Sequence, residues 1–427
     1  MPDSPAALRR CVGDVDRFVG ERWARRVHHH RGEDFSDLLS LEHVDHIVAT
    51  MALRAPAFRL VKQGRTLERA SYTRTARVGS RSIDDLIDVG RVYRHFDDGA
   101  TIVLQGLHRY WEPVTRFCRD LELALTHPVQ ANAYVTPPVS TGLKVHHDPH
   151  DVFALQTFGR KQWVTYEAGP DAAEARPDTG PDAAEAGPDT GPDAAGPVPD
   201  AAAGAAPALD AAPALDAVPA LDVELVPGDA LYLPKGTPHA ARTVDVASVH
   251  LTIGIRTVVW RDVARRLLDQ ALDDPGLDEP LPPGFARDPA ALAGLAAARL
   301  PALAEAVARA DAGPAARAES RRFWSGRAPL LTGHLRQLLE LDGIDDGARL
   351  ARRAGSVCEL VAGNGRLTVL LGDRELRMPS TLEPAMRVVA GRDSFRVGEL
   401  APHLDLQGRL VLVRRLVREG LLTVAGG

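Results

Sequence analysis

The sequence predicts an α+β fold, in which a small β-barrel or jelly roll is preceded by helices and followed by a helical block and a smaller mixed domain. Short runs that alternate apolar and polar residues, separated by Gly and Pro corners, occupy 129–167 and 223–257. This pattern is typical of antiparallel barrels and jelly rolls. Residues 261–342 repeat apolar side chains at helical spacing instead. Strand-like residues return over 356–379, and 395–424 follow the order helix, turn, helix, strand, which is the outline of a winged helix.

Length and composition are consistent with more than one folded domain. At 427 residues the chain exceeds one ordinary domain, and its 45% apolar residues suffice for extensive cores. The net charge of −6 gives no indication of a nucleic-acid or membrane partner. Direct binding to nucleic acid is therefore not expected from the overall composition.

Cysteine usage and the N-terminus predict a cytoplasmic protein. Cys11, Cys118 and Cys358 are scattered without C-x-x-C spacing, which favours reduced thiols over a disulfide frame or a zinc finger. The N-terminal residues contain no apolar signal segment, and we expect no segment to approach a membrane span. No membrane partner is expected.

The N-terminal part is expected to be mainly helical, because apolar residues recur there at helical spacing. Helices are predicted over 13–30, 35–53, 82–96 and 107–125, with a buried strand over 100–106. In the third helix, Ser82 and the acidic residues after it suit a helix N-terminus. The three histidines at 28–30 cannot all face one ion, so we interpret them as a solvated helix end or turn.

A low-complexity insertion interrupts the strand pattern. The copies GPDAAEARPDT (169–179) and GPDAAEAGPDT (180–190) are followed by a partial third copy and by three repeats of PALD. These repeats have almost no large apolar side chains, so they cannot offset the entropy lost on ordering. We interpret 168–222 as a disordered or loosely ordered loop between two strands of one domain.

The strands on either side of this insertion place several polar residues toward the barrel interior. In 129–136, Asn132 and Tyr134 share one face of a strand. Runs 152–158 and 161–167 flank Gly159-Arg160, which predicts a tight hairpin. Lys161 would then lie on the second strand of that hairpin, where its ammonium can meet a carboxylate inside the barrel.

A candidate metal site follows from KVHHDPH and LPKGTPH. Side chains at i and i+2 of a strand point to the same face, so His146 and Asp148 can converge on one ion while His147 points away. His239 follows a strand and a Pro-Lys-Gly corner, where a barrel-mouth ligand belongs. Two histidines and one carboxylate form the facial triad typical of non-haem Fe(II) oxygenases.

Other interpretations of these histidines remain open. A lone H-x-D can be a polar turn beside Pro149, and His147 with His150 forms a rival pair whose spacing does not place both on one strand face. His250 either lines the pocket or is a hydrogen-bonded core histidine, and we favour the pocket wall.

The stretch NAYVTPPVSTGLKVHHDPHDVFALQTFGRKQWVTYE, together with VPGDALYLPKGTPHAA and SVHLT, resembles the JmjC (cupin-type) 2-oxoglutarate oxygenases, and among them the ribosomal-protein hydroxylases. The resemblance implies a double-stranded β-helix that binds Fe(II) through His146, Asp148 and His239. It implies that Lys161 pairs with the distal carboxylate of 2-oxoglutarate, and that Asn132 and Tyr134 line the pocket.

The resemblance extends along nearly the whole chain outside the insertion. It implies a JmjC domain over 1–260, a helical dimerisation domain over 261–345 and a winged-helix-like domain over 346–427. The implied activity is hydroxylation of an arginine or histidine side chain of a ribosomal protein by a homodimer.

Three alternatives remain. A demethylase or a small-molecule hydroxylase would use the same iron site. A winged-helix DNA-binding regulator with a degenerate cupin would use a basic stretch, Arg409, Arg414, Arg415 and Arg418. Because apolar residues interleave with these arginines, a packing or dimer-support role is favoured for that module. A sugar-isomerising cupin would have little use for Lys161.

Overall fold

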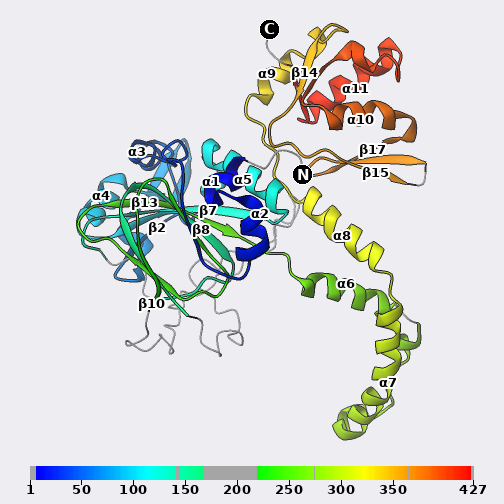
Figure 1. The fold of residues 1–427 in the computed structure, drawn as a ribbon, viewed down its shortest axis with the longest axis horizontal. Helices are drawn as coiled ribbons and strands as arrows, with labels where there is room; N and C mark the ends of the chain where they lie inside the picture. Colours follow the sequence, from blue (N-terminus) through cyan, green and yellow to red (C-terminus); the bar gives the residue numbers. More distant parts are fainter. Residues whose placement is uncertain (1–5, 141–144, 168–218, 274, 364, 425–427) are drawn as a thin grey trace. The chain divides into compact units, whose positions relative to one another are not determined.

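The computed structural model describes residues 6–140, 145–167, 219–273, 275–363 and 365–424 (Figure 1). Its chain divides into two compact units, residues 1–257 and 258–427. From the sequence we predicted that the first domain ends at residue 260, which is three residues beyond the end of the first unit. The further division at residue 345 stays a prediction.

Unit 1 is built on two antiparallel sheets that face each other. The larger has the strand order β1-β11-β8-β13-β7-β6-β2-β3, and the smaller has the order β10-β9-β12. The strands of the larger sheet are β1 (His28–Arg31), β2 (Phe58–Lys62), β3 (Arg65–Thr66), β6 (Thr101–Leu104), β7 (Val129–Thr136), β8 (Asp151–Gly159), β11 (Asp229–Leu233) and β13 (Ser248–Ile255). The smaller sheet contains β9 (Lys161–Tyr166), β10 (Pro219–Leu225) and β12 (His239–Arg242). A separate hairpin pairs β4 (Thr73–Val78) with β5 (Arg81–Ile87).

The alternation of side chains along β8 explains why both faces of the larger sheet are buried. Val152 and Ala154 point inward and pack with Trp163 of the smaller sheet. Phe153 and Leu155 point outward into the core formed with the N-terminal helices. The predicted jelly roll is therefore confirmed, as is the mixed helix and sheet content.

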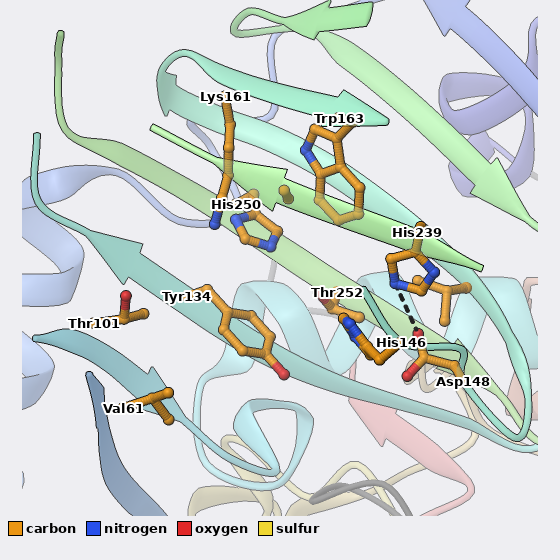
Figure 2. Close-up of a pocket in the computed structure, with 12 residues that line it drawn as sticks. Val61, Thr101, Tyr134, His146, Asp148, Lys161, Trp163, His239, His250 and Thr252 are labelled. Carbon is orange, nitrogen blue, oxygen red and sulfur yellow. Dashed lines mark ion pairs between the residues drawn. The ribbon is translucent and has the colours of Figure 1, made fainter. Parts of the chain in front are cut away.

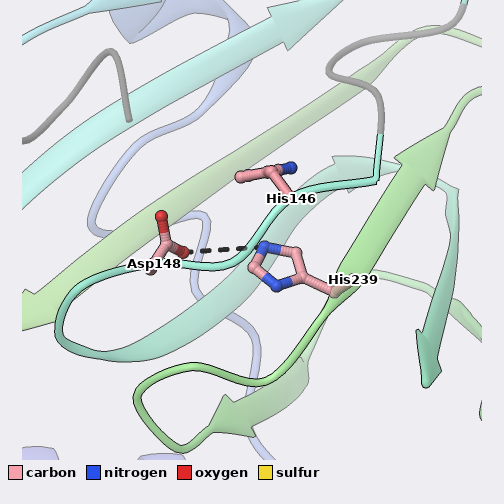
Figure 3. Close-up of side chains that lie close together, drawn as sticks. All are labelled: His146, Asp148 and His239. Carbon is pink, nitrogen blue, oxygen red and sulfur yellow. Dashed lines mark ion pairs between the residues drawn. The ribbon is translucent and has the colours of Figure 1, made fainter. Parts of the chain in front are cut away.

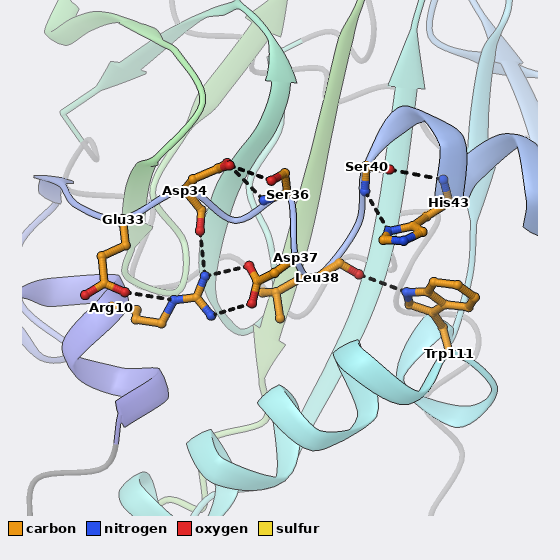
Figure 4. Close-up of polar contacts among 9 residues, drawn as sticks. All are labelled: Arg10, Glu33, Asp34, Ser36, Asp37, Leu38, Ser40, His43 and Trp111. Atoms are coloured by element: carbon orange, nitrogen blue, oxygen red, sulfur yellow. Dashed lines mark hydrogen bonds and ion pairs between the residues drawn. The ribbon is translucent and has the colours of Figure 1, made fainter.

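Helices cover the outer face of the larger sheet. They are α1 (Ala6–Val12), α2 (Val15–Arg17), the π-helix η1 (Phe18–Arg22), α3 (Leu41–Thr50), α4 (Val89–Asp97) and α5 (Glu112–Leu125), with 3-10 turns η2 (Arg69–Ser71) and η3 (Leu107–Arg109). The Ser40 hydroxyl caps α3 by accepting from the His43 amide. Polar contacts tie these helices together, since Arg10 binds both oxygens of Asp37 and the Trp111 indole donates to the Leu38 carbonyl at 2.8 Å (Figure 4).

Two predicted helical stretches are strands in the structure. His28–Arg31 pairs antiparallel with β11 at the edge of the larger sheet, and Arg81–Ile87 pairs with β4. In both places pairing with a distant or neighbouring strand outweighs local helix propensity. The helix predicted from residue 82 begins only at Val89, after Asp88, whose carboxylate accepts from the Arg91 amide.

The predicted hairpin at Gly159-Arg160 is wrong. Strand β8 pairs with β11 and β13, whereas β9 pairs with β10 and β12, so the chain passes there from one sheet to the other. Gly159 has φ +63°, and a Cβ built on it would lie 1.8 Å from the Ala247 carbonyl oxygen. Only glycine fits this corner, which delivers Lys161 into the space between the sheets.

The insertion prediction falls mostly on 168–218, which lie outside the described residues. Pro219–Leu225 is described and forms β10, paired with β9. The last PALD repeat is therefore part of a strand and not of the loop that we predicted through residue 222.

Unit 2 begins with helices and ends with two small sheets. Its helices are α6 (Trp260–Leu272), α7 (Pro289–Arg309), α8 (Ala312–Ser325), α9 (His334–Leu339), α10 (Glu383–Gly391) and α11 (Leu406–Arg418), with 3-10 turns η6 (Pro275–Asp278), η7 (Phe285–Arg287), η8 (Leu341–Gly343), η9 (Ser380–Leu382) and η10 (Val397–Leu400). One sheet has the order β18-β14-β19, from Ser394–Arg396, Arg349–Arg352 and Leu422–Val424. The other has the order β15-β16-β17, from Glu359–Gly363, Arg366–Leu370 and Glu375–Pro379. Gly363 pairs with Arg366 where β15 and β16 meet.

One helix among the described residues, α7, is long and apolar enough to cross a membrane by length and composition alone. It has 21 residues, a mean hydropathy of 1.4 over the relevant window, and none of that window is buried. This finding differs from our expectation that no segment approaches a membrane span. Pro301 lies inside the helix.

Candidate metal centre

Two segments that lie far apart in the sequence meet at the mouth of the jelly roll. His146 lies in the connection between β7 and β8, and His239 begins β12. The His146 amide donates to the His239 carbonyl at 3.0 Å, and the His239 amide donates back to the His146 carbonyl at 2.8 Å. We expected the H-x-D segment to lie on a strand. The structure gives it only this single bridge, with Asp148 in an irregular stretch.

The three predicted ligands are together. One ligand atom each from His146, Asp148 and His239 lies within 4.8 Å of the other two (Figure 3). His239 Nε2 lies 3.6 Å from Asp148 Oδ2, and the two imidazole rings are 4.4 Å apart between centroids. Two imidazole nitrogens and one carboxylate on one side of an ion are a donor set suited to Fe(II). Their role as ligands is a proposal, made below.

Hydrogen bonding and burial prepare His239 for coordination. Its Nδ1 lies 2.8 Å from the Thr237 carbonyl oxygen, which can only accept, so the proton is on Nδ1 and the Nε2 lone pair is free. Burial, with the neighbouring His146, holds the pKa of His239 below its usual value, although Asp148 acts in the opposite direction. The 3.6 Å contact therefore joins a carboxylate to a neutral imidazole.

A buried carboxylate, Asp151, fixes the loop that leads to His239. Asp151 accepts from the Tyr232 hydroxyl at 2.7 Å and from the Lys235 amide at 2.7 Å. One residue further along this loop, the Gly236 amide donates to the Asp148 carbonyl at 3.0 Å. Both metal-site segments are thus tied to one corner.

The three residues open onto a pocket between the sheets (Figure 2). The pocket contains about 600 Å³ of space free of protein atoms, including the part open to solvent. This size suits a small dicarboxylate together with one side chain. The described residues that line it are Val61, Thr101, Tyr134, His146, Asp148, Val152, Lys161, Trp163, His239, Ala241, His250 and Thr252.

Lys161 supplies a buried cation at the inner end of the pocket. Its side chain is 4% exposed, and its ammonium donates to Thr136 Oγ1 at 3.2 Å. Burial lowers the pKa of Lys161 to about 7. Among the residues that the structure describes, no carboxylate forms an ion pair with Lys161, although a buried ammonium favours such a partner.

His250 lines the pocket, as we favoured from its sequence. Its ring stacks on Tyr134, with centroids 5.1 Å apart and planes 9° apart, and meets the edge of Trp163 at 5.5 Å. Its Nδ1 is buried and has no hydrogen-bond partner within the described structure. Burial, and secondarily the charge of Lys161, holds the pKa of His250 well below its usual value.

The two polar residues of β7 have different surroundings. Tyr134 is one of the lining residues. Asn132 is not one of the described residues that line the pocket. Its Oδ1 accepts a hydrogen bond from the Gly106 amide at 2.9 Å. Sequence reasoning missed Thr136, which supports Lys161, because a threonine at a strand end carries no local signal of this contact.

The remaining histidines do not join the site. His150 contacts Gln130 Nε2 at 3.3 Å, and the rings of His28 and His30 stack with centroids 6.4 Å apart. Within the described residues, only His146, Asp148 and His239 group closely enough to hold one metal ion.

The comparisons with known proteins agree with this geometry. Residues 107–187 and 200–263 match the family model described as JmjC domain. A relative from Dictyostelium discoideum, named bifunctional lysine-specific demethylase and histidyl-hydroxylase NO66, is 28% identical over 184 residues, which is 43% of this chain and 30% of the relative. A Drosophila grimshawi protein of the same name is 26% identical over 246 residues, 56% of this chain and 29% of its own length. The chain thus spans less than a third of the length of these relatives.

Solved structures extend the likeness to the whole chain. The X-ray structure of Escherichia coli ycfD has a TM-score of 0.53 at 18% identity and covers 96% of this chain and 98% of its own. YcfD described as a ribosomal oxygenase in complex with cobalt and 2-oxoglutarate gives a TM-score of 0.51 at 17% identity, with the same coverage. Residues 107–187 and 200–263 of this chain are therefore similar to a JmjC domain, and the chain has the fold of those solved structures.

Proposed function

We propose that this protein is an Fe(II)- and 2-oxoglutarate-dependent hydroxylase of a ribosomal-protein side chain. One observation carries the proposal. The pocket contains a group of two histidines and one aspartate, and it also contains a buried lysine, Lys161, that forms no ion pair with a described carboxylate. The first suits a mononuclear iron with open positions. The second suits the far end of a dicarboxylate.

The pocket residues are suited to both Fe(II) and 2-oxoglutarate. His239 presents a free Nε2 whose orientation is fixed by Thr237, and His146 is set opposite it by their shared backbone bridge. Lys161 would anchor the distal carboxylate as its ammonium, supported by Thr136. The unpartnered Nδ1 of His250 is a second group in the same pocket that can donate to an anion.

When bound, Fe(II) and 2-oxoglutarate supply the chemistry that inserts one oxygen of dioxygen into a substrate C–H bond and releases succinate and carbon dioxide. The protein's share is to bind, orient and exclude water. Trp163 and Tyr134 form apolar walls, and Lys161 is buried, so its attraction for a carboxylate is stronger than in water.

Pocket charge favours histidine over arginine as the substrate side chain. Of the described lining residues, only Asp148 is a carboxylate, and we assign it to the metal. A guanidinium entering this pocket would have no carboxylate partner there. An uncharged imidazole needs no such carboxylate partner. A demethylase or a small-molecule hydroxylase would share the iron site and is distinguished only by its product.

The C-terminal module supports a packing role better than DNA binding. Three of the four arginines of α11 bind the protein itself: Arg409 Nη2 lies 2.9 Å from Asp346, and Arg414 donates to the Ile344 carbonyl at 2.9 Å. Arg415 pairs with Glu419. Guanidinium groups so engaged are poorly placed to contact bases. We propose that residues 346–427 form a winged-helix-like domain with this packing role.

We include a homodimer formed through 261–345 in the proposal. Helix α7 has no buried residue, and Leu295 and Leu300 are 43% and 60% exposed. An apolar helix in water is stabilised by a second copy that covers it. The protein is further proposed to act in the cytoplasm.

Calorimetric titration tests whether the pocket binds the metal ion and 2-oxoglutarate through these residues. Cobalt, used in place of iron, should bind the wild-type chain but not His146→Ala, and 2-oxoglutarate should bind the cobalt-loaded wild type but only weakly Lys161→Ala. Equal cobalt binding by wild type and His146→Ala would contradict the ligand assignment.

A further inference from the structure

The hairpin formed by β4 and β5 concentrates positive charge on a chain that is acidic overall. Residues 54–94 contain ten lysines and arginines against four aspartates and glutamates, whereas the whole chain has a net charge of −6. Four of these arginines, Arg69, Arg74, Arg77 and Arg81, lie on the hairpin and on the turn η2 before it, and all four are exposed. We call this group the basic hairpin.

The guanidinium groups of the basic hairpin make no ion pair among the described residues. Asp84 and Asp85 both lie on β5, where the Asp84 carboxylate accepts from the Thr75 hydroxyl at 3.0 Å, and Asp88, just after β5, contacts Arg91 at 3.6 Å. Glu68 is exposed and precedes Arg69 in the chain.

Several exposed arginines elsewhere have an acidic partner on the same helix. In unit 2, Arg309 pairs with Glu305, Arg387 with Glu383 and Arg415 with Glu419, each four residues apart on a helix. The basic hairpin differs from these pairs in that no ion pair is seen for its four arginines among the described residues. Glu68, Asp84 and Asp85 offset part of the repulsion among the four arginines, and a bound anion would offset more of it.

The strand geometry spreads the charge around the hairpin. Arg74 and Arg77 are three residues apart on β4, so they point to opposite faces. Arg81 pairs with Val78 and lies on the face of Arg74. A narrow two-stranded ribbon with cations on both faces can contact several phosphates of one RNA strand.

The base of the hairpin is fixed. The Arg54 guanidinium donates to the Asp84 carbonyl at 2.9 Å, and Arg54 forms a β-bridge with Leu86. From α4, Arg91 donates to the carbonyls of Ala70 and Thr73 at 3.3 and 3.2 Å. A ribbon held at its base presents its arginines without a large entropy cost on binding.

We propose that the basic hairpin is a docking surface for the phosphate backbone of RNA. Arginine favours phosphate because its planar group can give two parallel hydrogen bonds to the oxygens. An acidic protein partner is less well matched, since such interfaces also need apolar contacts. On the described hairpin only Val78 is a large exposed apolar residue, at 63% exposure. The proposal does not depend on the iron site.

This surface revises the expectation drawn from net charge. Overall acidity describes the whole chain, whereas a phosphate chain responds to charges within roughly 10 Å in ordinary salt. A local cluster can therefore bind RNA on an acidic protein.

The test is fluorescence anisotropy of a labelled single-stranded RNA with the full chain at increasing salt. We expect the affinity of Arg74→Glu/Arg77→Glu/Arg81→Glu to fall by more than about tenfold, and its salt slope to fall by about 2, since each phosphate contact contributes about 0.7 for single strands. The matched control Arg26→Glu/Arg287→Glu/Arg366→Glu reverses three exposed arginines outside the hairpin and should retain the wild-type slope.

Several outcomes would overturn the proposal. These are the absence of RNA binding at low salt, equal losses in both triple variants, or a polyglutamate peptide that binds the wild type as tightly as RNA. Thermal unfolding checks that the hairpin variant is folded, and Arg74→Gln/Arg77→Gln/Arg81→Gln must show the same loss in smaller degree. Neither readout uses oxygenase activity, so failure here is distinct from failure of the proposed function.

Discussion

His146 and His239 form a reciprocal backbone pair, in which each amide donates to the carbonyl of the other, at 3.0 and 2.8 Å. Directly opposed residues in such a pair project their side chains to the same face. The bridge thus places two imidazoles on one side, with ring centroids 4.4 Å apart, before any ion binds. The backbone therefore sets the arrangement of two of the three proposed ligands.

Replacing the proposed ligand His146 should greatly weaken metal binding, whereas replacing its neighbour His147 should not. We expect His146→Ala to lower the affinity for Fe(II) or cobalt by more than about 100-fold, which exceeds the loss typical of an outer-shell residue. His147→Ala is the matched control and should bind metal nearly as wild type, because His147 is not part of the close group. Equal losses in the two variants, measured by calorimetry, would show that the ligand set is wrong.

Cosubstrate affinity should weaken as pH rises above 7. Burial lowers the pKa of Lys161 to about 7, so its ammonium loses its proton in the free protein above that pH. A dicarboxylate needs the charged form, and the dissociation constant of 2-oxoglutarate should therefore rise by up to about tenfold per pH unit. Calorimetry in two buffers of different ionisation enthalpy should detect proton uptake on binding. A pH-independent affinity would contradict the role of Lys161.

The stability of the unliganded protein should increase over the same range. The pKa of Lys161 is lower in the folded state than in the unfolded chain, so the unfolded chain binds more protons between pH 7 and the ordinary lysine value. Stability attributable to this group is therefore lost as pH falls toward 7 and below. Lys161→Met should remove this part of the pH dependence and melt at a higher temperature at neutral pH. A lower melting temperature for Lys161→Met would show that burying the ammonium is not costly.

His250 should contribute to cosubstrate binding through its free nitrogen. His250→Phe keeps a planar ring between Tyr134 and Trp163 but removes Nδ1. A hydrogen bond to a charged group contributes about 1.5 kcal/mol, so the dissociation constant of 2-oxoglutarate should rise about tenfold. The melting temperature should stay close to wild type. An unchanged dissociation constant would make His250 a wall residue only.

Asp151 should be required for stability and for metal affinity together. Asp151→Ala leaves the Tyr232 hydroxyl and the Lys235 amide without their acceptor, and each buried unmet donor costs about 1–3 kcal/mol. The loop before His239 would lose its fixed position, so metal affinity should also fall, by about 10-fold or more. Tyr232→Phe is the control, since it leaves Asp151 bound to Lys235. A stability loss with unchanged metal affinity would limit Asp151 to a structural role.

The sequence was most informative where chemistry and strand pattern coincide. His146, Asp148 and His239 could be proposed because their residue types suit a metal, and the alternation around Phe153 marks a strand buried on both faces. The sequence did not show that His146 pairs with His239, because a contact across so many residues has no local signature. For the same reason His28–Arg31 was predicted as a helix end and is an edge strand.

The central claim is best tested by measuring succinate from 2-oxoglutarate in air, with Fe(II) and a ribosomal protein, together with the mass of that protein. We expect succinate only when Fe(II) is present, a rise on adding the ribosomal protein, and a gain of one oxygen atom on a histidine. His147→Ala should behave as wild type and Asp148→Ala should be inactive. No iron-dependent succinate under these conditions would contradict the account.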